Sequence, residues 1–246
     1  YAIKANGNLA ILQLIHGLGC GLDAVSVGEL QRALKAGADP RRVILSGVGK
    51  RDDEIAQALD AGVLYVCVES EHEIGAVARI AAEKGVRAPI SIRVNPDVDP
   101  KTHPHIATGL KKNKFGIPMA LAAAVCSSVA QTASLRLMGV TCHIGSQITA
   151  LEPFSDAARR MGQLVTDLQS GGIAIEHLGM GGGLGVPYGD PKQPQEPPQP
   201  EAYGKALEAF GTADSSRPSD NYIQVCRAAT GAGDQAIKVL EKRLGS

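Results

Sequence analysis

Short apolar segments alternate with longer amphipathic segments along most of this 246-residue chain, and this alternation strongly constrains the fold. Seven apolar segments are typical of strands: YAI (1–3), GLDAVS (21–26), RVILSGV (42–48), LYVCVES (64–70), ISIRVN (90–95), GVTCHIG (139–145) and HLGMGGG (177–183). Strands that alternate with helices pair in parallel through right-handed crossovers. Seven such units in about 180 residues favour a (β/α)8 barrel of the α/β class over an open doubly wound sheet.

The segments between the strands have the pattern of amphipathic helices. Apolar residues recur at spacings of three and four, and many segments end at glycine, the residue that best terminates a helix. The clearest examples are GELQRALKAGA (28–38), DDEIAQALDAG (52–62), EHEIGAVARIAAEKG (71–85) and MALAAAVCSSVAQ (119–131). A further helix is predicted at EAYGKALEAFG (201–211).

Seven strands leave an eight-stranded barrel one strand short. The proline-rich stretch 187–200 is predicted to be a loop or insertion over the barrel mouth. Beyond it, NYIQVC (221–226) could form the last strand and DQAIKVLEKRL (234–244) the last helix. We therefore divide the chain into a barrel domain at 1–211 and a divergent C-terminal tail at 212–246. Because the first strand has no polar lead-in, we also expect residues before Tyr1.

The composition favours small-molecule chemistry. Lysine plus arginine equals aspartate plus glutamate at 25 each, so no overall charge attracts nucleic acid or an acidic membrane surface. No apolar run reaches the roughly 20 residues that span a bilayer, and no leader pattern precedes the first strand. The five cysteines include no C-x-x-C pair, which argues for reduced thiols rather than disulfides or a metal site. We expect a cytoplasmic protein.

The ends of the predicted strands carry the candidate site, because all strands of a parallel barrel end at one face. These residues are Lys4, Asn6, Asp23, Ser26, Ser46, Gly47, Glu69, Arg93, Asn95, His143, Ser146, Gly181, Gly182 and Gly183. A lysine amine can attack a carbonyl, and a glycine run lets backbone N–H groups approach a phosphate. Ser146 could add a hydroxyl donor, and His143 could lie flat against a planar ring. Pyridoxal phosphate requires this combination.

Each of these features alone has a simpler structural explanation. A lysine at a strand end is usually solvated or ion-paired, and a histidine there is usually structural. The segment GGGLG (181–185) could serve only a turn, and it does not match the G-x-G-x-x-G pattern of a Rossmann fold. Their joint placement at strand ends is what favours a cofactor site.

Several longer segments carry a family resemblance. They are YAIKAN, GLDAVSVGEL, ILSGVGK, SIRVNPDVD, THPHIATG, NKFGI, CHIGSQ and GGGLGVPY, and they extend over residues 1–210. Together they resemble the barrel family of pyridoxal-phosphate-dependent decarboxylases, which includes diaminopimelate, ornithine and arginine decarboxylases and, more distantly, alanine racemase. HPHIATG followed by NKFG, together with HIGSQ, points to the diaminopimelate branch.

The resemblance implies a role for each candidate residue. Lys4 would hold pyridoxal 5'-phosphate covalently, His143 would stack on its pyridine ring, and Ser146 and Gly181–Gly183 would bind its phosphate. The residues implied to tune and orient the surroundings of Lys4 and His143 are Asp23, Glu29 and Arg93. The implied reaction is that of a carboxy-lyase of lysine biosynthesis, which converts meso-2,6-diaminopimelate to L-lysine and carbon dioxide, in a family that works as a homodimer.

Two features of the family have no counterpart in the sequence. It contains no EPGR segment, whose glutamate pairs with the pyridine nitrogen in relatives, and no β-rich second domain. We therefore expect a truncated relative with a weakened dimer interface, in which Arg227 is a poor substitute for the usual substrate arginine. The alternatives are a degenerate barrel that binds cofactor or a partner without chemistry and, less well supported, an amino-acid racemase.

Overall fold

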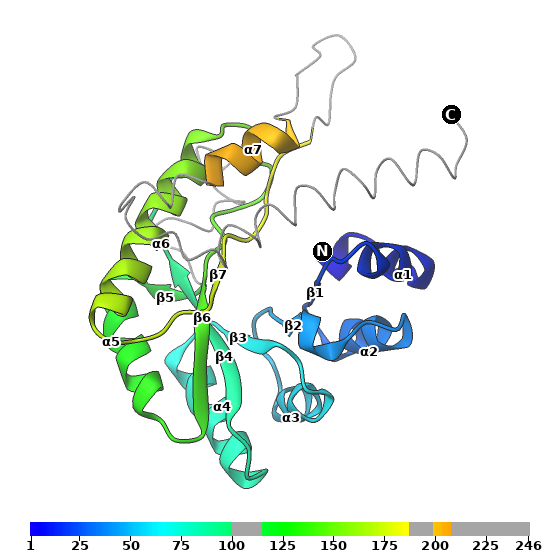
Figure 1. Cartoon of the computed structure of the whole chain (residues 1–246), viewed down its shortest axis with the longest axis vertical. Coiled ribbons are helices and arrows are strands. Elements are labelled where there is room, and N and C mark those ends of the chain that lie inside the picture. The colour runs from blue at the N-terminus through cyan, green and yellow to red at the C-terminus, as the bar shows by residue number, and fades with distance from the viewer. Residues whose placement is uncertain (100–114, 187–198, 208–246) are drawn as a thin grey trace. The chain divides into compact units, whose positions relative to one another are not determined.

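The computed structural model describes residues 1–99, 115–186 and 199–207 (Figure 1). The chain divides into two compact units. Of the described residues, unit 1 holds Tyr1–Ser91 and 128–138, and unit 2 holds the rest. The predicted tail at 212–246, the strand at 221–226, the helix at 234–244 and the segment THPHIATG lie outside the described residues.

Unit 1 begins with repeated helix–strand alternation. In chain order up to Glu83, its elements are η1 (Ile3–Ala5), α1 (Leu9–Gly17), β1 (Leu22–Ala24), α2 (Val27–Lys35), η2 (Pro40–Arg42), β2 (Val43–Leu45), α3 (Asp52–Ala61), β3 (Tyr65–Val68) and α4 (Glu71–Glu83). Strands β1, β2 and β3 pair in parallel, with Asp23 opposite Ile44 and Ile44 opposite Tyr65. This register fixes which side chains share a face of the sheet.

The remaining elements continue the alternation. They are β4 (Ala88–Asn95), β5 (Ile117–Pro118), α5 (Met119–Gln131), β6 (Leu135–Thr141), α6 (Glu152–Ser170), β7 (His177–Gly179) and α7 (Pro200–Leu207). In the described residues the strand order is β1-β2-β3-β4-β6-β7, with β5 beside β4. Strand β4 pairs with β5 in parallel, and β6 pairs with β7 in parallel. The predicted α/β class is confirmed.

The first predicted strand is the main local difference. Ala2 forms a single parallel bridge with Asp23, and the chain then enters the 3-10 turn η1 instead of continuing as a strand. After Asn6 and Gly7 comes Asn8, whose side chain accepts a hydrogen bond from the N–H of Ala10 and caps α1. The cap requires an extended backbone at Asn8 and a helical backbone at Leu9. Few residues therefore remain in which a first strand could continue.

The other predicted elements are present with shifted ends. Each of the six later predicted strands overlaps an observed one, and β6 begins at Leu135, four residues earlier than expected. Helix α3 ends at Gly62, which adopts φ 71° as a left-handed C-cap. The short strand β5 was not predicted, because a two-residue strand has too few residues to show alternation.

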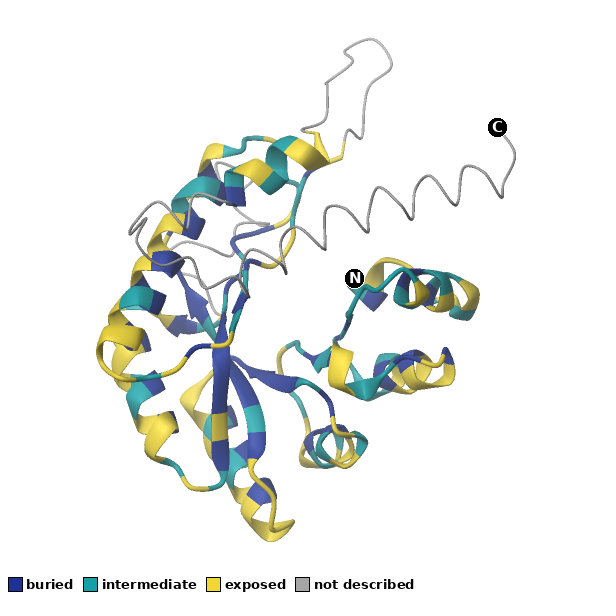
Figure 2. Ribbon diagram, in the orientation of Figure 1, coloured by how far each residue is buried: buried dark blue, intermediate teal, exposed yellow. Residues whose placement is uncertain are grey.

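Most residues of the strands are buried, as the dark colour along them in Figure 2 shows. On one face of β3, Tyr65 and Cys67 pack with Met138. On the other face, Val66 and Val68 are fully buried. Burial on both faces is typical of parallel sheets covered by helices. Among the described residues, no helix is both long and apolar enough to cross a membrane.

Candidate active site

Lys4 lies in η1, directly after the residues that pair with β1. Its side chain is exposed, while the neighbouring Ile3 is buried. The hydroxyl of Tyr1 donates to the carbonyl of Asn6 at 3.2 Å, which closes the turn around Lys4. The structure therefore places the exposed lysine side chain in the turn that follows the Ala2 bridge to Asp23, and its cofactor role stays a prediction.

Asp23 and Ser46 come from neighbouring strands of unit 1. The Ser46 hydroxyl donates to Oδ1 of Asp23 at 2.5 Å. Asp23 pairs with Ile44, so Ser46, two residues farther on, lies on the same face of the sheet. The structure thus brings together two of the residues predicted at strand ends.

Glu29 serves the backbone of the turn between β1 and α2. Its Oε2 accepts from the N–H of Val25 at 2.8 Å, and its own N–H donates to the Ser26 hydroxyl at 3.3 Å. These bonds satisfy donors that the helix start would otherwise leave without partners. The tuning role that the resemblance implies for Glu29 stays a prediction.

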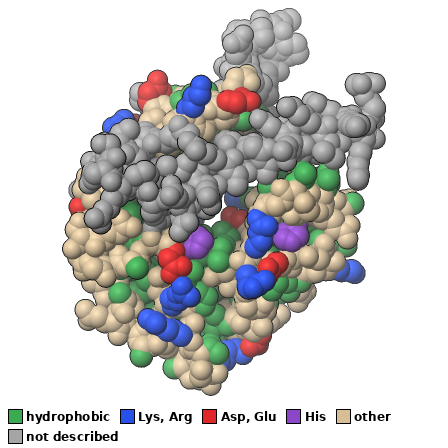
Figure 3. Space-filling model, in the orientation of Figure 1, with side chains coloured by type: hydrophobic (Ala, Val, Ile, Leu, Met, Phe, Trp, Pro, Cys, Tyr) green, Lys and Arg blue, Asp and Glu red, His purple; other side chains and the backbone are tan. Residues whose placement is uncertain are grey.

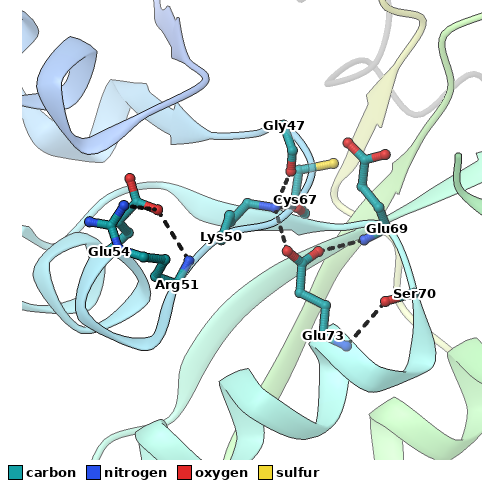
Figure 4. Close-up of polar contacts among 8 residues, drawn as sticks. All are labelled: Gly47, Lys50, Arg51, Glu54, Cys67, Glu69, Ser70 and Glu73. Atoms are coloured by element: carbon teal, nitrogen blue, oxygen red, sulfur yellow. Dashed lines mark hydrogen bonds and ion pairs between the residues drawn. The ribbon is translucent and has the colours of Figure 1, made fainter.

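Lys50 and Glu73 form a buried ion pair that the candidate residues did not include (Figure 4). The Lys50 Nζ donates to the carbonyls of Gly47 and Cys67, at 2.5 and 2.6 Å, and to Oε1 of Glu73 at 3.0 Å. Oε2 of Glu73 accepts from the N–H of Glu69 at 2.8 Å. One sequence pattern points to the pair of Lys50 and Glu73: Glu73 follows a serine by three residues, as Glu29 does.

In unit 2, His143 lies against the glycine segment after β7. The N–H of Gly182 donates to Nδ1 of His143 at 3.4 Å. The N–H of Cys142 donates to the carbonyl of Gly179 at 2.7 Å, which keeps the two chain segments parallel. His143 and Gly181–Gly183, predicted separately, are therefore neighbours.

The glycines at 181 and 183 are required by backbone geometry. Their φ values are 68° and 111°. A Cβ would stand 2.6 Å from the carbonyl oxygen of Cys142 at Gly181, and 2.0 Å from that of Gly145 at Gly183. At Gly182 a Cβ would meet nothing within 4 Å, so this backbone is open to an approaching group.

The exposed hydroxyl of Ser146 follows the segment that packs on Gly183. Hydroxyl and backbone N–H donors on an open, glycine-rich segment are what a phosphate group requires. The residues of unit 2 therefore fit the phosphate of pyridoxal phosphate.

Arg93, in β4, has its guanidinium carbon 5.7 Å from the centre of the Phe115 ring, a cation–π contact. Two residues farther along the strand, Asn95 accepts from the N–H of Asp97 at 3.0 Å through Oδ1. Asp97 has φ 55°, which an adjacent side-chain hydrogen bond helps to hold. Arg93 thus lies in a well-fixed part of unit 2, and its cofactor role stays a prediction.

The predicted site residues fall into the two units. Lys4 and Asp23 belong to unit 1, and Arg93, His143, Ser146 and Gly181–Gly183 belong to unit 2. Their convergence on one cavity stays a prediction. The described residues contain no group of His, Cys, Asp and Glu arranged for a metal ion. Basic and acidic side chains are mixed on the face shown in Figure 3, in keeping with the balanced charge of the sequence.

Comparison with known proteins identifies similar sequences. The family model described as pyridoxal-dependent decarboxylase, pyridoxal binding domain, matches residues 1–216. The chain is 52% identical over 207 residues to the diaminopimelate decarboxylase of Pseudomonas aeruginosa, covering 84% of this chain and 49% of that protein. The values are the same for the diaminopimelate decarboxylase of Vibrio cholerae. The chain spans about half the length of the curated relatives it matches.

Solved structures show the same similarity. Diaminopimelate decarboxylase from Helicobacter pylori, complexed with L-lysine, matches with a TM-score of 0.81 and 42% identity, over 87% of this chain and 54% of that one. Diaminopimelate decarboxylase from m. jannaschii, in co-complex with L-lysine, matches with a TM-score of 0.81 and 36% identity, over 90% of this chain and 51% of that one. The predicted fold, an incomplete barrel of this decarboxylase type, is confirmed.

Proposed function

The chain belongs to the family of pyridoxal-dependent decarboxylases through its pyridoxal-binding domain, and we propose that it acts as a diaminopimelate decarboxylase. The proposed reaction converts meso-2,6-diaminopimelate to L-lysine and carbon dioxide. The observation that carries the proposal is the 52% identity to curated diaminopimelate decarboxylases over 207 residues. Substrate and activity are proposals, because the chain covers 49% of those proteins.

The family model is that of a pyridoxal-binding domain, and the cofactor is pyridoxal phosphate. Lys4 would bind its aldehyde carbon through the exposed amine. Ser146 and the backbone N–H groups of Gly181 and Gly183 would donate to its phosphate, and His143, held by the N–H of Gly182, would pack against its ring. When bound, pyridoxal phosphate supplies an electron sink for the pair released by the breaking C–C bond.

The protein's own contribution is orientation and charge placement. Asp23, held by Ser46, would supply a fixed negative charge at the strand ends near the bound group. The hydrogen bond from the N–H of Gly182 to His143 would fix the orientation of the imidazole. The face of the imidazole would then stay available to stack on the pyridine ring of the cofactor. Groups held in advance need no reorganisation during the reaction, which is how such sites gain rate.

Cofactor binding can be tested by absorbance after pyridoxal phosphate is added, followed by reduction with borohydride and mass spectrometry of the peptides. We expect an absorption band of lysine-bound cofactor and a modified peptide that contains Lys4. The Lys4→Ala variant should lose both. The matched control is Lys35→Ala, which removes another exposed lysine of unit 1 and should leave both unchanged. Labelling of several surface lysines with no preference for Lys4 would contradict the assignment.

Turnover is tested separately with meso-diaminopimelate. Formation of L-lysine and carbon dioxide supports the decarboxylase, whereas interconversion of diaminopimelate stereoisomers without carbon dioxide supports a racemase. A cofactor band without either product supports the alternative of a binding barrel without chemistry.

We further propose a cytoplasmic homodimer. The cytoplasm is supported by the described cysteines, Cys20, Cys67, Cys126 and Cys142, all of which are free thiols, as is usual in a reducing compartment. The dimer is supported only by the family resemblance. Light scattering of the purified chain measures its mass directly, and a monomer at all concentrations would contradict the dimer.

A further inference from the structure

We propose that Lys50 and Glu73 are positioning residues, whose buried ion pair holds the loop beside Asp23 and the backbone that carries Glu69 in place at the strand ends. The inference rests on the proposed function in one respect, namely that these strand ends bind the cofactor. Every contact that carries it lies within unit 1.

The strand register places the two carboxylates on one face. Asp23 pairs with Ile44, and Ile44 pairs with Tyr65. Since side chains alternate along a strand, Tyr65, Cys67 and Glu69 follow one another on the face that also carries Asp23. Glu69 is buried, with 8% of its surface exposed. Figure 4 shows its carboxylate directed away from Lys50 and Glu73, so it is the Glu69 backbone that the pair holds.

The Lys50 ammonium is fully occupied by acceptors. Its three N–H donors match three oxygens, two from backbone carbonyls and one from Glu73. The side chains of Lys50 and Glu73 are 3% and 9% exposed. A lysine side chain has three N–H donors, so these three acceptors leave it no donor for a further partner. Lys50 is therefore a fixed cation, in contrast to the exposed Lys4.

The pair connects two loops that end at the candidate site. Lys50 binds the carbonyl of Gly47, the residue next to Ser46, and Ser46 in turn donates to Asp23. Glu73 binds the N–H of Glu69 at the end of β3. One ion pair therefore restrains the residue that orients Asp23 and also the backbone that carries Glu69.

Removing one partner would leave a buried unpaired charge, which can prevent folding for reasons unrelated to positioning. The test therefore uses the double variant Lys50→Met/Glu73→Leu, because apolar residues of similar volume often replace a buried ion pair with little loss of stability. We expect this variant to unfold cooperatively. Its Glu69 amide should exchange at least about 10-fold faster, and pyridoxal phosphate should bind about 10-fold more weakly.

A matched control is the exposed pair of Asp52 and Arg79, which joins α3 to α4, the helix that carries Glu73. The variant Asp52→Asn/Arg79→Gln should keep both the Glu69 exchange rate and the cofactor affinity. Unchanged cofactor affinity in a folded Lys50→Met/Glu73→Leu protein would overturn the positioning role. Equal weakening in both double variants would also overturn it, because the effect would then be one of general stability.

A second readout separates this inference from the proposed function. If the unchanged protein binds no pyridoxal phosphate, the proposed function fails, but carboxyl ¹³C signals of Asp23 and Glu69 still report their surroundings. A shift of both signals in Lys50→Met/Glu73→Leu, and not in Asp52→Asn/Arg79→Gln, supports positioning. Signals that stay in place would overturn it.

Discussion

The hydroxyl of Ser46 donates a hydrogen bond to the carboxylate of Asp23 across two neighbouring parallel strands. Both residues were predicted from their positions at strand ends, and the structure adds the direct bond between them. Because Ser46 also precedes the loop that Lys50 binds through Gly47, the orientation of Asp23 depends on the loop after β2.

Ser46→Ala should lower the free energy of unfolding by about 1–2 kcal/mol, since it removes a donor to a partly buried carboxylate. Urea denaturation measures this change. The matched control is Ser127→Ala in α5, which removes a solvent-exposed bond to the carbonyl of Ala123 and should cost less than about 0.5 kcal/mol. If both substitutions lowered the free energy of unfolding equally, the bond to Asp23 would contribute no more to stability than an exposed bond does.

Gly183→Ala should lower the free energy of unfolding by about 1–3 kcal/mol and weaken cofactor binding. The added Cβ would stand 2.0 Å from the carbonyl oxygen of Gly145, a backbone atom that cannot rotate away. Gly182→Ala is the control, because a Cβ there meets nothing within 4 Å. It should leave the free energy of unfolding unchanged or raise it by up to about 1 kcal/mol, because alanine at an allowed conformation reduces the entropy of the unfolded chain. Denaturation of both variants measures the difference, and similar losses would contradict the role of the close contact.

The sequence was sufficient to predict the helices α2 to α5 and the six later strands, because their apolar residues recur with the period of each structure. It was insufficient at Ala2 to Ala5. There the apolar residues fit a strand, but the side chains of Asn6 and Asn8 bind the following backbone and start a helix. Local capping thus overrides an apolar pattern only three residues long.

In the candidate site too, the sequence predicts some residues but misses contacts between residues far apart in the chain. Asp23, His143 and Gly181–Gly183 were predicted because strand ends of a parallel sheet lie at one edge. Lys50 and Glu73 are 23 positions apart in the chain. A contact between such distant residues produces no periodic pattern in the sequence from which it could be predicted. Its acceptors at Gly47 and Cys67 are backbone carbonyls, which every residue type supplies.

Ser91→Ala should leave the free energy of unfolding unchanged or raise it by up to about 1 kcal/mol. The Ser91 hydroxyl is fully buried in β4 and has no hydrogen-bond partner among the described residues, so its removal relieves a desolvation cost. Ser134→Ala is the contrasting variant, because the Ser134 hydroxyl donates to the carbonyl of Ala78 at 3.0 Å. It should lose about 1 kcal/mol in the same denaturation experiment. A clear loss of stability in Ser91→Ala would contradict the absence of a partner.

Stability should decline in alkaline solution because of two buried thiols. Burial raises the pKa of Cys126 and that of Cys142 from 9.0 to about 12. In the unfolded chain both thiols deprotonate near pH 9, while in the folded protein they stay protonated, so the unfolded state is favoured as the pH rises. The contribution is fully present below pH 9 and is lost between pH 9 and about 12, at about 1.4 kcal/mol per pH unit for each thiol.

Urea denaturation at several pH values from about 8 to 11 measures this slope. The variant Cys126→Ala/Cys142→Ala should show a shallower decline, with the remaining slope carried in part by Tyr65, whose pKa burial also raises. Val129→Ala is the control, since it removes buried apolar atoms from α5 without removing a titratable group. It should lower stability by a similar amount at every pH and keep the original slope. If the double cysteine variant instead declined in parallel with the unchanged protein, other groups would have to account for the alkaline loss, because only a difference in proton uptake between the folded and unfolded states can change the slope.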